Sequence, residues 1–367
     1  MPWYTVADLD SIPSPALLVY PERVAENLDR MIAYAGGVER LRPHVKTHKT
    51  VELTRLQLDR GISKFKCSTI AEAEMVAMCG ANDVLLAIAA VGPNLARFVA
   101  LAAKYARTRF STLADDPAHA QATAEAAQRA GIEIELLVDL DVGMHRSGIE
   151  PSERALALYR QLCSSPGIRA GGLHIYDGHL RAAELAARTA EVSTAFAPVD
   201  RLAEQIRASG LPLPRIVAGG TFSFPIHARR SDIECSPGTP VLWDQAYATK
   251  VPDLDFLHAL VVLGRVVSRP AQGRLTLDLG YKAISADNAD PRVVFPEIPD
   301  ARMVNHSEEH LVIETTTATR YAVGDAIYGI PWHVCPTVAL HDEMRVIESG
   351  RSTGAWQIVA RKRRMTI

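Results

Sequence analysis

Residues 41–50, LRPHVKTHKT, gather two lysines, two histidines and an arginine into a stretch with almost no apolar side chains. The stretch lacks the hydrophobic period of a packed helix or strand, and Pro43 disfavours helix before it and has no backbone donor. The pattern predicts the end of a strand running into a loop. A lysine there can attack a carbonyl group if burial or nearby cations lower its pKa. A solvated basic turn is the alternative.

Lys46 is favoured as the reactive amine because it comes one residue after a valine that would close the strand. The side chains of Arg42, His44, His48 and Lys49 surround it in sequence and are expected to tune its pKa.

Two glycine turns suggest a phosphate site. Residues 218–221, AGGT, follow one short apolar run, and residues 236–239, SPGT, follow the next. Glycine lets the backbone approach an anion, and successive N–H groups with a hydroxyl can hold a phosphate. A single turn of this kind is more often only a turn, but two of them after late strands favour phosphate. The candidate ligands are Gly220, Thr221, Gly238 and Thr239.

Residues 139–148, DLDVGMHRSG, form a polar loop after a strand candidate. Arg146 in this loop suits a cofactor ring, an oxygen or a carboxylate. Pairing of Arg146 with Asp139 or Asp141 is the simpler interpretation of these residues alone.

Residues 174–179, HIYDGH, end another strand candidate. Alternation along the strand puts His174 and Tyr176 on one side, and His179 follows in the loop. Such a group can supply acid and base catalysis, although histidines also cap helices or fill polar cores.

His333 and Cys335, in the run PWHVCP, lie two positions apart at a predicted strand end. Imidazole and thiolate are ligands that suit zinc. Two ligands do not complete a site, so other groups, water or substrate would have to finish the shell. Glu309 and His310 are additional candidates.

The first two thirds of the chain alternate short apolar runs with amphipathic helical stretches. The strand candidates are 15–20, 65–68, 83–87, 109–112, 133–140, 171–176, 215–217 and 232–235. Helical stretches include 117–130, 152–164 and 182–209. This rhythm predicts parallel strands with crossover helices, closed into a (β/α)8 TIM-type barrel over residues 15–248. An open doubly wound sheet is the alternative.

After about residue 250 the helical period fades, and runs of Val, Ile, Leu and Thr are punctuated by Gly and Pro. The strand candidates are 259–267, 274–279, 311–318, 326–330, 337–341 and 344–348. Residues 1–14 and 249–367 are therefore expected to form a mostly antiparallel β domain.

The 367 residues are 48% hydrophobic and 22% charged, with a net charge of -2, which is ordinary for a soluble globular protein and gives no nucleic-acid signal. There is no apolar run long enough for a membrane span and no secretory signal. The five cysteines are sparse and lack CxxC spacing. We therefore expect a reduced, cytoplasmic location and no membrane partner.

With these residues in view, the chain resembles the fold-type III pyridoxal-phosphate enzymes. It is most similar to the group of D-threonine aldolase and D-serine dehydratase, distant relatives of alanine racemase. Residues 42–49 resemble that group's Schiff-base motif, with Lys46 as the matching lysine, and 141–148 resemble its cofactor-contacting arginine loop. The two glycine turns resemble its phosphate turns, and residues 333–337 resemble its metal motif.

The resemblance implies a homodimeric lyase that depends on pyridoxal 5'-phosphate and a divalent metal and acts on β-hydroxy-D-amino acids. Lys46 would carry the cofactor, with His44, Arg146 and Tyr176 around it, and His333 and Cys335 would bind zinc, or else manganese or magnesium. Aldol cleavage to glycine and an aldehyde is the preferred reaction. D-serine dehydratase activity, giving a 2-oxo acid and ammonia, is the alternative.

Two positions depart from the aldolase pattern. Cys335 stands where aldolases usually carry aspartate, as in the zinc-dependent D-serine dehydratases. Ala182 stands at the place of a catalytic histidine, so His179 and Tyr176 are the predicted acid and base. An amino-acid racemase, with Tyr281 as second base, and a non-catalytic pyridoxal-phosphate-binding protein are further alternatives; the latter class lacks a C-terminal β domain.

Overall fold

The computed structural model describes residues 2–367, and these divide into two compact units. The barrel unit comprises residues 31–46, 53–238 and 362–367, and the sheet unit comprises residues 2–30, 47–52 and 239–361. Within the described residues, no helix combines the length and apolar character that crossing a membrane requires.

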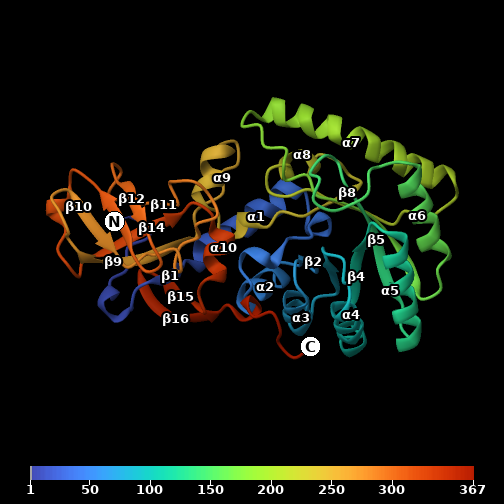
Figure 1. Ribbon diagram of the computed structural model, residues 1–367, viewed down its shortest axis with the longest axis horizontal. Helices are drawn as coiled ribbons and strands as arrows, with labels where there is room; N and C mark the ends of the chain where they lie inside the picture. The colour runs from blue at the N-terminus through green and yellow to red at the C-terminus, as the bar shows by residue number, and fades with distance from the viewer. Residues whose placement is uncertain (1) are drawn as a thin grey trace. The chain divides into compact units, whose positions relative to one another are not determined.

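The barrel unit contains seven parallel strands that pair in the order of the sequence. They are β2 (Lys64–Cys67), β3 (Asp83–Leu86), β4 (Arg109–Ala114), β5 (Ile134–Leu140), β6 (Ile168–Ile175), β7 (Ile216–Ala218) and β8 (Ile233–Cys235). The connecting helices are α2 (Val51–Leu58), α3 (Ile70–Met78), α4 (Pro93–Lys104), α5 (Pro117–Ala130), α6 (Glu153–Ser164), α7 (Leu185–Ala208) and α8 (Phe224–His227). Helices α3 to α6 lie outside the strands (Figure 1). The predicted barrel class is confirmed.

Residues 41–44 close the barrel between its last and first strands. A parallel bridge joins Leu41 to Cys235 after β8, and another joins His44 to Lys66 in β2. Backbone hydrogen bonds of 2.8 to 2.9 Å run along both edges of the segment. The basic motif therefore takes the place of an eighth strand, and Lys46 follows directly at the carboxyl end, where active sites of such barrels sit.

The strand expected first in the barrel lies elsewhere. β1 (Ala16–Val19) pairs antiparallel with β9 (Leu260–Ser268) and parallel with β15 (Glu343–Glu348) in the sheet unit. A short apolar run is typical of any buried strand, so the sequence of residues 15–20 does not indicate which of the two sheets the strand joins. Residues 41–44 do not form a short apolar run, because this barrel segment carries the polar side chains Arg42 and His44 and ends in a loop.

The sheet unit contains nine strands in a mixed, mostly antiparallel sheet, as expected. Besides β1, β9 and β15, these are β10 (Arg274–Leu277), β11 (Val293–Val294), β12 (Arg302–His306), β13 (Leu311–Glu314), β14 (Ala326–Pro331) and β16 (Arg351–Gln357). The path runs β12-β13-β10-β9-β1-β15-β16, and β14 pairs with β9 and β11. The short helix α9 (Gln245–Lys250) precedes β9, and α1 (Pro21–Ala35) follows β1.

The prediction of a strand over 337–341 is wrong, because a short helix, α10 (Val334–Ala339), occupies this part of the chain. The buried Asp244 carboxylate accepts a hydrogen bond of 3.0 Å from the Val334 N–H, one of the donors that a helix start leaves unpaired. The Thr337 hydroxyl donates to the His333 carbonyl at 2.8 Å. Asp244 is distant in sequence from this helix, so the local pattern of residues 337–341 could not predict its contact.

A buried ion network ties the closing segment to the strands. The Arg42 guanidinium is fully buried and donates to Asp83 Oδ1 at 2.6 Å and to Glu234 Oε2 at 2.8 Å. Burial alone would raise the pKa of Asp83, but the charge of Arg42 outweighs it and holds that pKa well below its usual range. Arg42 therefore links β3 to β8 across the closing segment.

Replacing Arg42 by methionine should lower the free energy of unfolding by about 3 to 5 kcal/mol, because the buried Asp83 carboxylate and the half-buried Glu234 carboxylate lose their shared cation. Chemical unfolding followed by far-UV circular dichroism measures this loss. The control is Arg30→Met, which removes a partly exposed pair with Glu26 at 2.9 Å and should cost about 1 kcal/mol or less. Equal losses in the two variants would contradict the role of Arg42.

Candidate cofactor and metal site

Lys46 lies in a single 3-10 turn, η3 (Val45–Thr47), directly after the closing segment. Its ammonium nitrogen is 5.9 Å from the centroid of the Tyr176 ring. Its backbone N–H donates to His44 Nδ1 at 3.3 Å, so His44 presents Nε2–H to the Ser68 hydroxyl at 3.0 Å. Because Arg42, His44 and His48 are buried, the alternative of a solvated basic turn is wrong.

Not all of the expected tuning residues act as cations beside Lys46. Arg42 is committed to the ion network with Asp83 and Glu234, so its predicted role is wrong. Burial lowers the pKa of His48 to about 3, which leaves its ring neutral, and the ring accepts the Thr50 N–H at 3.2 Å.

Arg146 contacts Tyr176 rather than a loop carboxylate. Its guanidinium carbon lies 4.5 Å from the Tyr176 ring centroid. Asp139 and Asp141, the alternative partners, are engaged by other groups: Asp139 by His174 and Ser147, and Asp141 by His145 and the Gly143 N–H. The structure thus brings Lys46, Arg146 and Tyr176 together at the carboxyl end of the barrel strands.

The sequence analysis missed a second lysine in the same place. Lys66 is buried in the middle of β2, and its ammonium nitrogen also lies 5.9 Å from the Tyr176 ring centroid. Burial and the charge of Lys46 lower the pKa of Lys66 to about 7. The sequence did contain a sign of it, a lysine between phenylalanine and cysteine in a predicted buried strand. Lysine is rarely buried unless it is paired or has a function.

The predicted acid and base residues lie on one loop. Tyr176 is half-buried, and its hydroxyl covers Gly178, where an added Cβ would come within 2.2 Å of it. His179 lies against Gly143 of the arginine loop, and its Nδ1 is buried without a hydrogen-bond partner among the described residues. His174 Nδ1 bonds Asp139 at 2.7 Å, and its Nε2 also has no such partner.

The turn after β7 is fixed by a buried hydrogen-bond chain. The Gly220 N–H donates to Ser223 Oγ at 3.2 Å, and Ser223 donates to Asp177 at 2.7 Å. The other Asp177 oxygen bonds His227 Nε2 at 2.7 Å. Burial would raise the pKa of Asp177, but these bonds, that from His227 foremost, lower it below its usual value.

The two predicted phosphate turns are joined to each other. The Ser236 N–H, after β8, donates to the Ala218 carbonyl at 3.2 Å, at the end of β7. Ser236 Oγ is buried and has no hydrogen-bond partner within residues 2–367, which is costly unless a ligand satisfies it. Thr221 is buried at the first turn, and Thr239 begins η4 (Thr239–Val241) directly after Gly238.

These features fit pyridoxal phosphate. An orphan hydroxyl at the joined glycine turns suits the phosphate group, and an aromatic ring with Lys46, Lys66 and Arg146 near it suits an anionic ring system. Lys46, Arg146, Tyr176, Ser236 and the turn at Gly220 are the residues of the barrel unit that would hold it.

The sheet unit positions the predicted metal ligands. His333 is the N-cap of α10, and Cys335 lies in its first turn. His333 Nδ1 bonds Asp287 Oδ2 at 2.6 Å, the His333 ring also hydrogen-bonds the Cys335 side chain, and Cys335 Sγ lies 3.2 Å from the Thr47 hydroxyl. Burial would lower the pKa of His333, but Cys335 and Asp287 outweigh it and raise that pKa to about 9. Asp287 had no sequence signal, since it lies far from the motif along the chain.

No three His, Cys, Asp or Glu side chains in the described part of the chain form a complete metal-binding group. Glu309, considered as an extra ligand, instead pairs with Lys282 at 3.2 Å. A metal at His333 and Cys335 would therefore need water or substrate to complete its shell.

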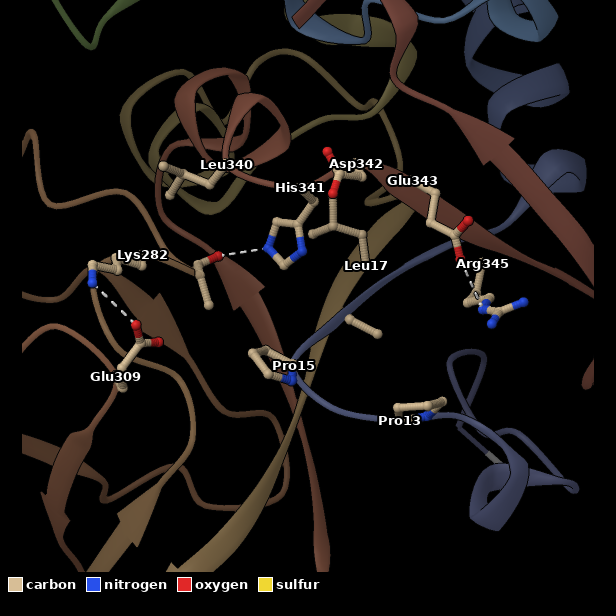
Figure 2. Close-up of a pocket in the computed structure, with 12 residues that line it drawn as sticks. Pro13, Pro15, Leu17, Lys282, Glu309, Leu340, His341, Asp342, Glu343 and Arg345 are labelled. Atoms are coloured by element: carbon tan, nitrogen blue, oxygen red, sulfur yellow. Dashed lines mark hydrogen bonds and ion pairs between the residues drawn. The ribbon is translucent and has the colours of Figure 1, made fainter.

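A separate cavity of about 370 Å³ lies in the sheet unit (Figure 2). Its charged lining is already paired: Lys282 with Glu309, and Arg345 with Glu343 at 3.3 Å. His341 Nε2 bonds the Ala283 carbonyl at 2.9 Å, and burial lowers its pKa. Of the candidate site residues, Glu309 lines this cavity; Lys46, Tyr176, Arg146, His333 and Cys335 do not.

Comparison with known proteins agrees with this geometry. The sequence matches the alanine racemase N-terminal domain over residues 19–239 and a putative serine dehydratase domain over residues 259–347. The chain belongs to the fold-type III pyridoxal-phosphate enzyme family. The resemblance noted from the motifs is thereby confirmed.

Three comparisons describe the chain's relatives. D-threonine aldolase from Arthrobacter sp is 30% identical, over 96% of this chain and 94% of that protein. The crystal structure of D-threonine aldolase from Filomicrobium marinum has a TM-score of 0.90 at 28% identity and covers 98% of each chain. A cysteine-to-alanine mutant of D-threo-3-hydroxyaspartate dehydratase, solved in the metal-free form, has a TM-score of 0.82 at 26% identity and covers 95% of this chain and 98% of that one.

Gly219→Ala should disrupt the turn after β7. Gly219 has φ +80°, and an added Cβ would lie 2.7 Å from both His227 and Ser223. The left-handed backbone costs about 1 to 2 kcal/mol for alanine, and the clash adds to it. The control is Gly210→Ala, with φ +70° and no atom within 4 Å, which carries only the backbone cost. Thermal unfolding should show a larger loss for Gly219→Ala; equal losses would refute the packed turn.

Proposed function

We propose that the protein is a pyridoxal-phosphate-dependent lyase that cleaves β-hydroxy-D-amino acids to glycine and an aldehyde, assisted by a divalent metal. The observation that carries the proposal is Lys46 beside Tyr176 and Arg146, at the carboxyl end of a barrel that this enzyme family uses. The aldolase relatives, which span nearly the whole chain, support the choice of reaction.

Lys46 is the residue that binds the cofactor aldehyde. The joined turns at Gly220 and Ser236 would hold the phosphate, and Arg146 and Tyr176 would hold the ring in place. When bound, the cofactor ring accepts the electron pair that leaves the broken Cα–Cβ bond of the substrate. His44 fixes the Lys46 backbone through its Nδ1, so the amine stays aimed at Tyr176.

His179 and Tyr176 are proposed to move the proton of the substrate β-hydroxyl. His179 has a buried nitrogen without a partner, as expected of a base that waits for a substrate group. The Tyr176 ring lies near Arg146, Lys46 and Lys66, and its hydroxyl is proposed to return a proton to Cα.

His333 and Cys335 are proposed to bind the metal, with zinc favoured because the pair is one imidazole and one thiolate. The Asp287 carboxylate orients the His333 ring, an arrangement common among metal-binding histidines. The metal supplies a Lewis acid for the substrate oxygens.

Dehydration to a 2-oxo acid and ammonia is the second candidate. Cys335 favours it, because the motif with cysteine resembles the D-serine dehydratases, and a D-threo-3-hydroxyaspartate dehydratase from Delftia sp. is 28% identical over 95% of this chain. Product analysis with D-threonine and D-serine separates the two reactions: glycine and aldehyde support aldol cleavage, and 2-oxo acid supports dehydration. The homodimer and the cytoplasmic location stay predictions.

Lys46→Ala should lose the near-visible absorbance of lysine-bound pyridoxal phosphate, because Lys46 is the amine proposed to form the attachment. The control is Lys49→Ala, the other lysine of the motif, which should keep the band. Borohydride reduction followed by peptide mass mapping locates the attachment. A modified lysine at any other position would overturn the assignment of Lys46.

Asp287→Asn should weaken metal binding about 10- to 100-fold, because the asparagine amide supports the His333 ring less well than a carboxylate. His333→Ala and Cys335→Ala should lose the metal after dialysis. Metal content by mass spectrometry checks this, with Cys163→Ala in α6 as the control that should keep it. Retained metal in all variants would place the metal site elsewhere.

A further inference from the structure

Lys66 is an amine with no partner in the interior of the barrel. Its side chain is buried, and its ammonium forms no salt bridge or hydrogen bond with any residue in 2–367; the ammonium nitrogen lies 5.9 Å from the centroid of the Tyr176 ring. Buried lysines are normally paired, because moving an unpaired ammonium out of water is costly. The missing partner therefore has to come from a bound molecule, or the amine has to lose its proton.

The surroundings of Lys66 favour the neutral amine while the pocket is empty. The charged and titratable groups that act on it are Lys46, Arg146, Asp139, Asp177 and His174. Both carboxylates are already engaged, Asp139 by His174 and Ser147, and Asp177 by Ser223 and His227. The two cations add to the cost that burial places on a third positive charge.

Binding of an anion at Tyr176 changes this balance. Lys46 and Lys66 lie at equal distances from the Tyr176 ring, and Arg146 lies closer, so a ligand at this ring meets all three. When Lys46 is used for covalent attachment, it no longer provides a free ammonium. Lys66 is then the buried amine left to face the anionic ligand together with Arg146.

We propose that Lys66 is a second, non-covalent cofactor-binding residue that takes up a proton when pyridoxal phosphate enters the pocket and then serves as a counter-charge for the bound anion. In this step the neutral amine gains one proton from solvent, and no bond of the cofactor is broken by Lys66. The proposal rests on the proposed function, since it needs pyridoxal phosphate as the ligand.

The test measures proton uptake during cofactor binding. Cofactor-free protein is titrated with pyridoxal phosphate at pH 8 by calorimetry, in two buffers of unequal ionisation enthalpy that contain no primary amine. With a pKa of about 7, roughly nine tenths of Lys66 is neutral in the empty pocket at this pH. The wild type should therefore take up nearly one proton more than Lys66→Met.

Lys66→Met should still show the absorbance band, because Lys46 is intact, but at pH 8 it should bind pyridoxal phosphate about tenfold more weakly, because it cannot supply the protonated amine that faces the bound anion. Lys66→Arg should keep the affinity and lose the uptake, since arginine is always charged. The control is Lys64→Met on the same strand, whose ammonium pairs with Glu234 at 2.7 Å and should leave the proton count unchanged. Thermal unfolding of each cofactor-free variant confirms that it folds.

The outcomes separate the two proposals. If wild type and Lys66→Met bind the cofactor with the same proton uptake and affinity, the role of Lys66 is refuted and the proposed function stands. If the wild type binds no pyridoxal phosphate, the proposed function fails and the role of Lys66 fails with it.

Discussion

The guanidinium of Arg42 lies inside the barrel between Asp83 of β3 and Glu234 of β8, and it fixes the short segment that closes the barrel. The segment makes only a few backbone hydrogen bonds to each neighbouring strand, and Pro43 provides no donor. The ion pairs of Arg42 therefore add stability to a segment that backbone hydrogen bonds alone would fix only weakly. Every residue of the cofactor pocket depends on this closure, because Lys46 begins where the segment ends.

The same closure sets the electrostatics of the pocket. His44 is bridged to Lys66, so the motif brings a buried lysine of β2 beside the lysine that it carries itself. Arg146 joins them at the Tyr176 ring from the loop after β5. Two cations and a buried amine lie near one aromatic ring, and the nearby carboxylates are already paired, so the site favours an anionic ligand. The orphan hydroxyl of Ser236 points to the same conclusion at the phosphate turns.

The sheet unit holds His333 and Cys335, the proposed metal ligands, at the start of a six-residue helix. α10 is too short to be stable through its own hydrogen bonds, so Asp244 and Thr337 supply bonds at its start. Burial raises the pKa of Asp244 to about 6, even though it accepts N–H groups from both α9 and α10. Asp287 then orients the His333 ring. The ligands are thus placed by residues that are distant in sequence.

The sequence by itself determined the barrel rhythm, the β-rich second part and most of the candidate residues, because strand and helix periods, glycine turns and the His-x-Cys spacing are local patterns. It could not place β1, because a short apolar run satisfies either sheet equally well, and it could not reveal that residues 334–339 form a helix whose first N–H is bonded by Asp244. Nor could it show that Arg42 faces Asp83 and Glu234 instead of Lys46. Only the tertiary structure brought Lys66 to Tyr176 and Asp287 to His333, since these pairings depend on strand order and loop closure, which no spacing along the chain encodes.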